Sequence, residues 1–255
     1  MDAAIVNPVK NHRTPRLDRV AVMVSTQADL ARLRGALGPS ATCRKLYNSQ
    51  LYLPPQGSAL PALAGPMMGA PYAAAMLESL IAWGAREILF LGWCGSISTD
   101  LKAGDIIVPT AAFSDEGTAS HYGHRRGEFS LPDATLRRGL KTELESNQTP
   151  LYSGPVWTTD AVFRETRAKV QRFQTAGLLA VEMETSALFA VAAFRQVRLA
   201  SLLVVSDELG SLTWKPGFKA PGFKAARETA AQAVMKFSRQ RLQAPAHTPQ
   251  PLAQP

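Results

Sequence analysis

Apolar and polar positions follow two periods along most of this chain, and they predict alternating strands and helices. Short apolar runs at 19–25 and 87–91 are typical of strands, and the run at 87–91 is typical of a strand buried on both faces. The stretch 71–83 is typical of a helix, with a proline in its first turn and a glycine after its end. The predicted strands are residues 19–25, 87–91, 104–109, 152–157, 178–181 and 199–206. The predicted helices are residues 27–37, 71–83, 132–145, 165–174, 184–195 and 224–242.

This alternation predicts an α/β fold in which helices cover both sides of a largely parallel sheet. Residues 41–57 show no clear pattern and receive no assignment. No change of composition marks an internal boundary, so we expect one domain over residues 19–243, after a flexible arm at 1–18. The last residues, 244–255, are rich in proline and poor in apolar residues, which is typical of a disordered tail.

Composition and charge narrow the class of protein. Of the 255 residues, 46% are hydrophobic and 19% are charged, as in a globular chain. The net charge of +8 comes from basic residues spread along the chain without a dense tract, so we expect no nucleic-acid partner. No apolar run reaches the roughly 20 residues that span a bilayer, and no signal peptide is evident. With only Cys43 and Cys94, a reduced, cytoplasmic protein is expected.

Three acids stand at predicted strand ends. Glu182 and Glu184 lie between the strand at 178–181 and the next helix, and Asp207 follows the strand at 199–206. In parallel α/β sheets the ligand crevice lies at the carboxyl ends of the strands, and a carboxylate is costly to bury there unless it holds something polar. The acids therefore predict a site for a polyhydroxylated molecule with a proton-accepting end.

Structural roles are the alternative for the same residues. Glu182 and Glu184 could be acids that a helix dipole favours in its first turn. Asp207 could cap a following turn, and Met183 could be an ordinary core residue. The sequence by itself leaves these alternatives open.

A glycine-rich segment follows the strand predicted at 87–91. Its sequence, GWCGS at 92–96, predicts a sharp turn whose backbone approaches a ligand closely. Backbone N–H groups in such a turn could cradle an oxyanion. A glycine turn after a strand is common, so this segment gains meaning only from its neighbours.

Taken in order, these segments resemble the nucleoside phosphorylase superfamily, which contains purine nucleoside and uridine phosphorylases and related nucleosidases. The resemblance covers residues 19–236 and implies a three-layer α/β/α sandwich with a mixed, mostly parallel, partly barrel-like sheet. It also implies cleavage of a base–ribose bond and assembly into dimers, trimers or hexamers. The segments are GWCGS at 92–96, LKAGDIIVP at 101–109, DEGTASHY at 115–122, WTTDAVF at 157–163, AVEMETSAL at 180–188 and VVSDE at 204–208.

The resemblance assigns roles residue by residue. Glu184 and Met183 match the residues that hold the ribose, and Glu182 matches an acid beside them. Asp207 matches the acid that protonates a purine at N7, which favours a purine substrate. A basic residue pairs with this acid in the family, and Lys215 or Lys219 could supply it here. The remaining residues expected to bind substrate are Val162, Phe163, Cys94, Gly95 and Trp93.

The chain departs from the family where phosphate is bound. Phe90 stands in place of a phosphate-binding arginine, and Trp93 in place of a small hydroxyl residue. The loop at 25–29 lacks the family's arginine. Loss of arginine clamps weakens the binding of a dianion, so phosphate would need other groups, for which the candidates are Ser96, Arg164 and Arg125.

Three hypotheses of function follow. The first is a phosphorylase that acts on a purine nucleoside with phosphate as co-substrate. The second is a nucleosidase that uses water, and the third is a non-catalytic nucleoside-binding protein. None of them requires a cofactor, and the scattered His and Cys residues predict no metal site.

Overall fold

The computed structural model describes residues 4–146 and 148–245, and all elements below lie within these ranges. The strands are β1 (Val20–Val24), β2 (Thr42–Leu46), β3 (Ser49–Leu53), β4 (Ala62–Gly65), β5 (Glu87–Ser96), β6 (Ile106–Ile107), β7 (Ala111–Asp115), β8 (Phe129–Ser130), β9 (Pro155–Thr159), β10 (Ala180–Glu182), β11 (Arg198–Glu208) and β12 (Lys215–Pro216). The helices are α1 (Gln27–Gly35), α2 (Ala70–Trp83), α3 (Ala134–Ser146), α4 (Arg167–Thr175), α5 (Thr185–Phe194) and α6 (Pro221–Gln243), with short 3-10 helices η1 (Thr118–Tyr122) and η2 (Val162–Arg164).

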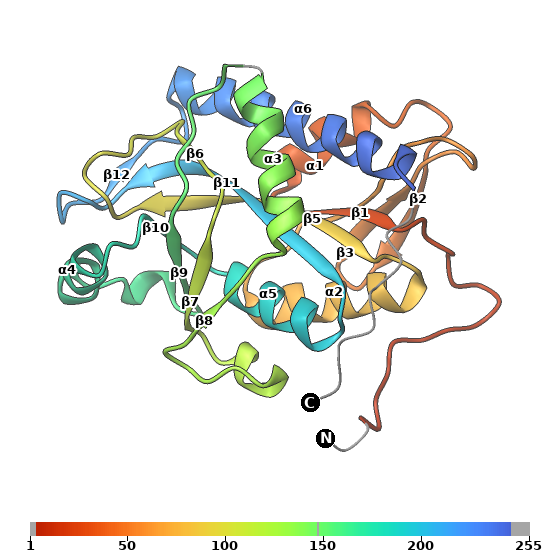
Figure 1. The fold of residues 1–255 in the computed structure, drawn as a ribbon, viewed down its shortest axis with the longest axis horizontal. Coiled ribbons are helices and arrows are strands. Elements are labelled where there is room, and N and C mark those ends of the chain that lie inside the picture. The colour runs from red at the N-terminus through yellow and green to blue at the C-terminus, as the bar shows by residue number, and fades with distance from the viewer. Residues whose placement is uncertain (1–3, 147, 246–255) are drawn as a thin grey trace.

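One mixed sheet runs through the molecule (Figure 1). Its strand order is β2-β3-β4-β1-β5-β10-β9-β7-β8, and β11 pairs with β5 along that strand's whole length. The pairs of β1 with β4 and β5, β5 with β11, and β9 with β7 and β10 are parallel, whereas β10 meets β5 antiparallel. β6 joins β11 to Tyr152, just before β9, and so turns the sheet towards a partly closed barrel.

Helices cover both faces of this sheet. α2 and α5 pack on one face, where Phe90, Leu188 and Phe189 belong to one buried cluster. α1, α3 and α6 cover the other face, as Figure 1 shows, with Leu140 and Val234 in a second cluster. The predicted α/β fold with helices on both sides of a mixed, mostly parallel sheet is confirmed.

The glycine-rich turn predicted at 92–96 is wrong, because β5 continues through it to Ser96. The glycines serve close packing instead of turning. A Cβ atom on Gly92 would lie 2.8 Å from the Phe90 ring, and one on Gly95 would lie 2.5 Å from Leu209 Cδ1. Since the chain is extended there, the expected cradle of exposed N–H groups does not form as a turn.

A gap on one edge of β5 creates the space for a site. β11 occupies one edge throughout, and the other edge pairs with β1 as far as Leu91 and with β10 from Gly95 onward. Within the described chain, residues 92–94 therefore have no strand beside them on that edge. A change of neighbour of this kind is where α/β sheets commonly bind ligands.

Other boundaries differ from the sequence predictions. Residues 41–57, which had no assignment, form the antiparallel hairpin of β2 and β3. The strand predicted at 104–109 is reduced to β6, and β11 extends past residue 206 through a bulge. The tail prediction falls largely on residues 246–255, which lie outside the described residues. In the arm, the Trp83 indole donates to the Val9 carbonyl at 2.9 Å.

Among the described residues, none of the helices is long and apolar enough to cross a membrane.

Candidate active site

A cavity of about 430 Å³ opens at the gap in β5. Nine predicted substrate-site or catalytic residues line it: Trp93, Cys94, Gly95, Val162, Phe163, Glu182, Met183, Glu184 and Asp207. Larger cavities of about 800 and 920 Å³ lie elsewhere, without the carboxyl pair described below. The volume at the gap is within the roughly 300–1,000 Å³ typical of small-molecule sites.

Glu182, at the end of β10, holds the start of α5. One carboxylate oxygen accepts the backbone N–H groups of Glu184 at 2.8 Å and Thr185 at 2.7 Å. The other accepts a hydrogen bond from the Thr158 hydroxyl. Both oxygens are thus used within the protein, so Glu182 faces the cavity but acts as a helix cap.

Glu184 lies beside this cap and points one oxygen at a backbone N–H. Its Oε1 accepts from Gly69 N at 2.6 Å, just before α2 begins. Burial, with the charge of Glu182, raises the pKa of Glu184 to about 8. Burial also raises the pKa of Glu182, whereas the Thr158 hydroxyl and the two N–H donors act against this shift by favouring its charged form.

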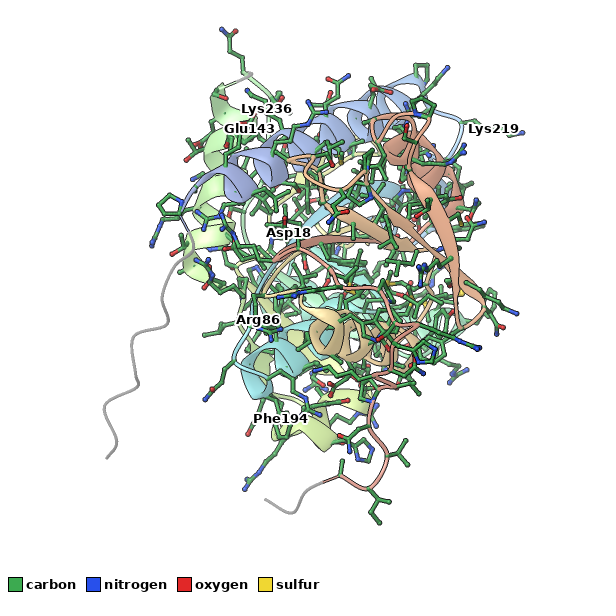
Figure 2. The ribbon with its side chains drawn as sticks, turned by 90° about the vertical axis from the view of Figure 1, so that its right-hand side faces the viewer. Asp18, Arg86, Glu143, Phe194, Lys219 and Lys236 are labelled. Carbon is green, nitrogen blue, oxygen red and sulfur yellow. The ribbon has the colours of Figure 1, made fainter. Side chains whose placement is uncertain are left out.

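Asp207 sits on β11 just after the bulge, opposite Gly95 of β5. Its Oδ1 accepts from the Ser206 hydroxyl at 2.6 Å, and its Oδ2 accepts from the Trp214 indole N–H at 2.8 Å. Its partners among the described residues are thus neutral donors. Lys215 and Lys219 are exposed, and Lys219 extends from the outer surface in Figure 2. Neither lysine is among the partners of Asp207 given above, so neither takes the expected pairing role.

Cys94 and Met183 also line the cavity, together with these acids. Burial raises the pKa of the Cys94 thiol well above its ordinary value, and the charges of Asp207 and Glu182 raise it further. The thiol is therefore protonated at neutral pH and serves as a compact apolar wall.

Glu165 is a lining residue that the sequence analysis missed. It follows η2, and burial together with the charge of Asp207 raises the pKa of its carboxyl to about 7, against the opposing charge of Lys169. In the sequence it looks like an ordinary acid at a helix start. That it shares a cavity with Asp207 depends on the fold, so no local signal distinguishes it.

Large apolar side chains stand at the mouth of the cavity. Phe163 is 97% exposed, Met68 78% and Trp214 61%, and Val162 and Phe218 are also exposed. They come from three segments, before α2, in η2, and between β11 and α6. A group of exposed apolar side chains around a cavity mouth indicates a surface that contacts an apolar ligand group or another chain.

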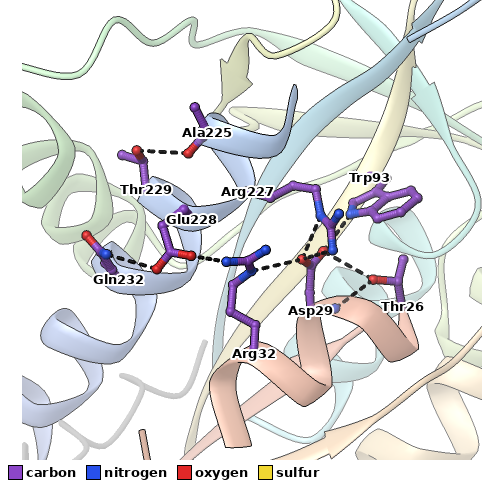
Figure 3. Close-up of polar contacts among 9 residues, drawn as sticks. All are labelled: Thr26, Asp29, Arg32, Trp93, Ala225, Arg227, Glu228, Thr229 and Gln232. Carbon is purple, nitrogen blue, oxygen red and sulfur yellow. Dashed lines mark hydrogen bonds and ion pairs between the residues drawn. The ribbon is translucent and has the colours of Figure 1, made fainter. Parts of the chain in front are cut away.

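A polar network closes the end of the cavity near Trp93 (Figure 3). The Trp93 indole donates to Asp29 Oδ2 at 2.6 Å, and Arg227 Nε donates to Asp29 Oδ1 at 2.8 Å. The Arg227 guanidinium carbon lies 4.8 Å from the centre of the Trp93 ring. Asp29 is only 2% exposed, and Thr26 caps its helix at the same point. Phe90, the other departure from the family pattern, is fully buried in the core.

The three residues expected to bind phosphate do not line this cavity. Ser96 is buried, and its hydroxyl donates to the Leu101 carbonyl at 3.1 Å. Arg164 and Arg125 are exposed. The lining residues of the described chain include four carboxyls, of Glu165, Glu182, Glu184 and Asp207, and no Lys, Arg or His.

Metal ligation has no geometric basis in the part of the chain that is described, where no three His, Cys, Asp or Glu side chains are grouped to hold an ion.

Comparisons with known proteins find similar sequences and similar folds. A family model described as "Phosphorylase superfamily" matches residues 19–243. A guanosine phosphorylase of Halorubrum lacusprofundi is 32% identical over 143 residues, which is 56% of this chain and 58% of the relative. A DeoD-type purine nucleoside phosphorylase of Myxococcus xanthus is 34% identical over 143 residues, which is 56% of this chain and 60% of the relative. The chain thus spans less than two thirds of either relative.

Solved structures share the fold at low identity. A uridine phosphorylase of Vibrio fischeri ES114 superposes with a TM-score of 0.76 at 20% identity, covering 91% of this chain and 99% of that one. A 5'-methylthioadenosine/S-adenosylhomocysteine nucleosidase of Helicobacter pylori gives a TM-score of 0.72 at 17% identity, covering 88% and 99%.

Proposed function

The chain belongs to the phosphorylase superfamily, and from this premise we propose that it cleaves the N-glycosidic bond of a nucleoside. The first candidate reaction is phosphorolysis, which gives a free base and ribose 1-phosphate. It is supported by the phosphorylase names of the relatives at 32% and 34% identity.

One observation carries the proposal: Glu184 and Asp207 line the same cavity from two different strand ends. Glu184 holds Oε1 on the Gly69 N–H, and its carboxyl lines the cavity in which we place the sugar. Ribose hydroxyls that donate to this carboxyl favour its ionised form, against the burial that raises its pKa. These hydrogen bonds strengthen as the ring flattens towards an oxocarbenium ion. Asp207 delivers a proton to the base, so that the base leaves as a neutral molecule.

We further propose a purine as the base. In the family resemblance an acid at the position of Asp207 protonates purine N7. Phe163 and Trp214 provide aromatic surface at the mouth of the cavity, on which a planar base can stack.

Phosphate as nucleophile requires cations that the cavity lining lacks. The lining offers four carboxyls and no cation to a dianion, and Arg227 is committed to the Asp29 carboxylate. If the reaction is phosphorolysis, a cation from outside the lining must bind the phosphate. Arg164 and Arg125 remain the predicted sources of that cation.

Water is the second candidate nucleophile, and the Trp93–Asp29–Arg227 network favours it. An aromatic ring stands where the family has a small phosphate-binding hydroxyl residue. The buried Asp29, in the first turn of α1, lies in the segment where the family has an arginine. Neutral water needs no cationic clamp at that end of the cavity.

The deciding experiment incubates the purified protein with a panel of purine and pyrimidine nucleosides, with and without phosphate. Ribose 1-phosphate formed at a rate that saturates in phosphate supports phosphorolysis. Free ribose at a phosphate-independent rate replaces phosphorolysis by hydrolysis. Binding without cleavage under either condition contradicts both reactions and supports the non-catalytic hypothesis.

A cytoplasmic location and assembly into homo-oligomers belong to the same proposal, on the family resemblance. Light scattering coupled to size-exclusion chromatography tests the assembly, and a monomeric mass contradicts it.

A further inference from the structure

The Glu165 carboxyl is the acid in the cavity for which the reaction above has no use. It lines the cavity directly after η2. Among the hydrogen bonds and ion pairs of the described residues, none involves its carboxylate, although its backbone N–H donates to the Val162 carbonyl at 3.3 Å. A half-buried carboxyl without a protein partner is costly unless a ligand satisfies it.

The other three acids of the cavity have tasks. Glu182 uses both oxygens on α5 and Thr158, and Glu184 is bound to Gly69. Asp207 has both oxygens held in place by Ser206 and Trp214, which orients it. Glu165 is therefore the lining carboxyl whose oxygens are both available.

Glu165 lies at the end of the cavity where the base leaves. The charge of Asp207 acts on its carboxyl, and both residues line the cavity with Phe163 and Trp214. The neighbouring cation, Lys169 of α4, is paired with Asp115 at 2.6 Å. A group on the base is thus the partner that this geometry offers to Glu165.

We propose that Glu165 accepts a hydrogen bond from an amino group on the base and so selects nucleosides whose base carries one. This inference rests on the proposed function of the cavity. An ionised carboxylate accepts hydrogen bonds and cannot donate them, so it favours an amino group and repels an oxo group at the same position. Buried polar groups left without partners make such discrimination strong.

The experiment compares adenosine, which carries a 6-amino group, with inosine, which carries a 6-oxo group. Assays run about one unit above the pKa of about 7, where Glu165 is mostly ionised. The parent protein is expected to prefer adenosine in kcat/KM and in equilibrium binding by calorimetry. The preference should be about tenfold or more, the effect of one hydrogen bond to a charged group.

Two variants separate recognition from a structural role. Glu165→Ala should bring the ratio of kcat/KM for adenosine to kcat/KM for inosine towards one, and the ratio of the two binding constants likewise. Glu165→Gln should shift the ratio further towards inosine, because its amide N–H donates to the 6-oxo group. The matched control is Glu145→Gln, an exposed acid on α3, which should leave the ratio unchanged.

The outcomes distinguish this inference from the proposed function. A parent that favours inosine, or variants that keep the parent's ratio, would overturn the role of Glu165. If no nucleoside is cleaved, the proposed function fails, and the calorimetric ratio in parent and variants still decides whether Glu165 selects the amino group. Binding of neither nucleoside overturns both.

Discussion

The Trp93 indole N–H donates a 2.6 Å hydrogen bond to the buried carboxylate of Asp29, and this bond joins the middle of β5 to the start of α1. Arg227 of α6 pairs with the same carboxylate at 2.7 Å and covers the indole ring. Three segments of the chain that are far apart in sequence thereby meet at one end of the cavity (Figure 3).

Asp29→Asn should destabilise the protein through this network. The change leaves the mostly buried charge of Arg227 without its partner, which costs about 3–5 kcal/mol of unfolding free energy. The double variant Asp29→Leu/Arg227→Met should recover much of this loss, since replacing a buried ion pair by apolar groups is often neutral. Urea unfolding measures both, and equal losses in the single and double variants would contradict the account.

Asp207→Asn should lower kcat on the best nucleoside by about 10²–10⁴-fold, the usual contribution of a general acid. The amide keeps the size of the side chain, so the thermal unfolding midpoint should stay near that of the parent. Steady-state kinetics on both proteins provide the check. Turnover within a few-fold of the parent would show that Asp207 is not the acid.

Glu184→Gln should lower kcat/KM by about 10–150-fold, because the amide cannot become the carboxylate that accepts charge-assisted hydrogen bonds from the bound sugar. Its circular dichroism spectrum should match that of the parent. If activity per folded molecule is unchanged, Glu184 does not bind the sugar.

The stability of Glu184→Gln relative to the parent should rise with pH. The folded pKa of Glu184 is about 8, above its ordinary value of 4.5, so folding takes up a proton between these values. The contribution of this carboxyl to stability is therefore greatest below about pH 4.5 and decreases by up to about 1.4 kcal/mol per pH unit as pH rises towards 8. Glutamine does not titrate and shows no such loss. Urea unfolding from about pH 5 to 8 tests this sign, and a constant difference between the proteins would contradict it.

Glu182→Gln should reduce stability and activity together. The change removes the charged cap on Glu184 N–H and Thr185 N–H at the start of α5, at a cost of about 1–3 kcal/mol. The start of α5 also carries Glu184, so kcat/KM should fall as the cap loosens. Unfolding and kinetic measurements on the same preparation serve as the test, and lost activity at full stability would make Glu182 a substrate ligand instead of a cap.

The sequence by itself determined the alternation of helices and strands, because each element carries its own apolar period. It also placed Glu182, Glu184 and Asp207 at the carboxyl ends of strands, since strand ends and the acids that follow them are local features. The ordered motifs were sufficient to indicate the superfamily, which the match over 19–243 confirms.

One hairpin and the extent of one strand were less predictable from the sequence. The hairpin of β2 and β3 carries a run of exposed residues in β2, so its sequence lacks the apolar run that marked the other strands. The glycines at 92 and 95 indicated a turn, although their small size is required by Phe90 and Leu209 in three dimensions.

Only the tertiary structure decided which polar side chains are bonded within the protein and which face the cavity. Glu182 and Glu184 are two residues apart, yet the contacts made after folding turn one into a helix cap and leave the other facing the cavity. Glu165 comes under the charge of Asp207, and Asp29 bonds to Trp93 and Arg227, because elements that are distant along the chain pack together. Hydrogen bonds and charge interactions depend on distances in space, and a linear sequence carries no direct record of those distances.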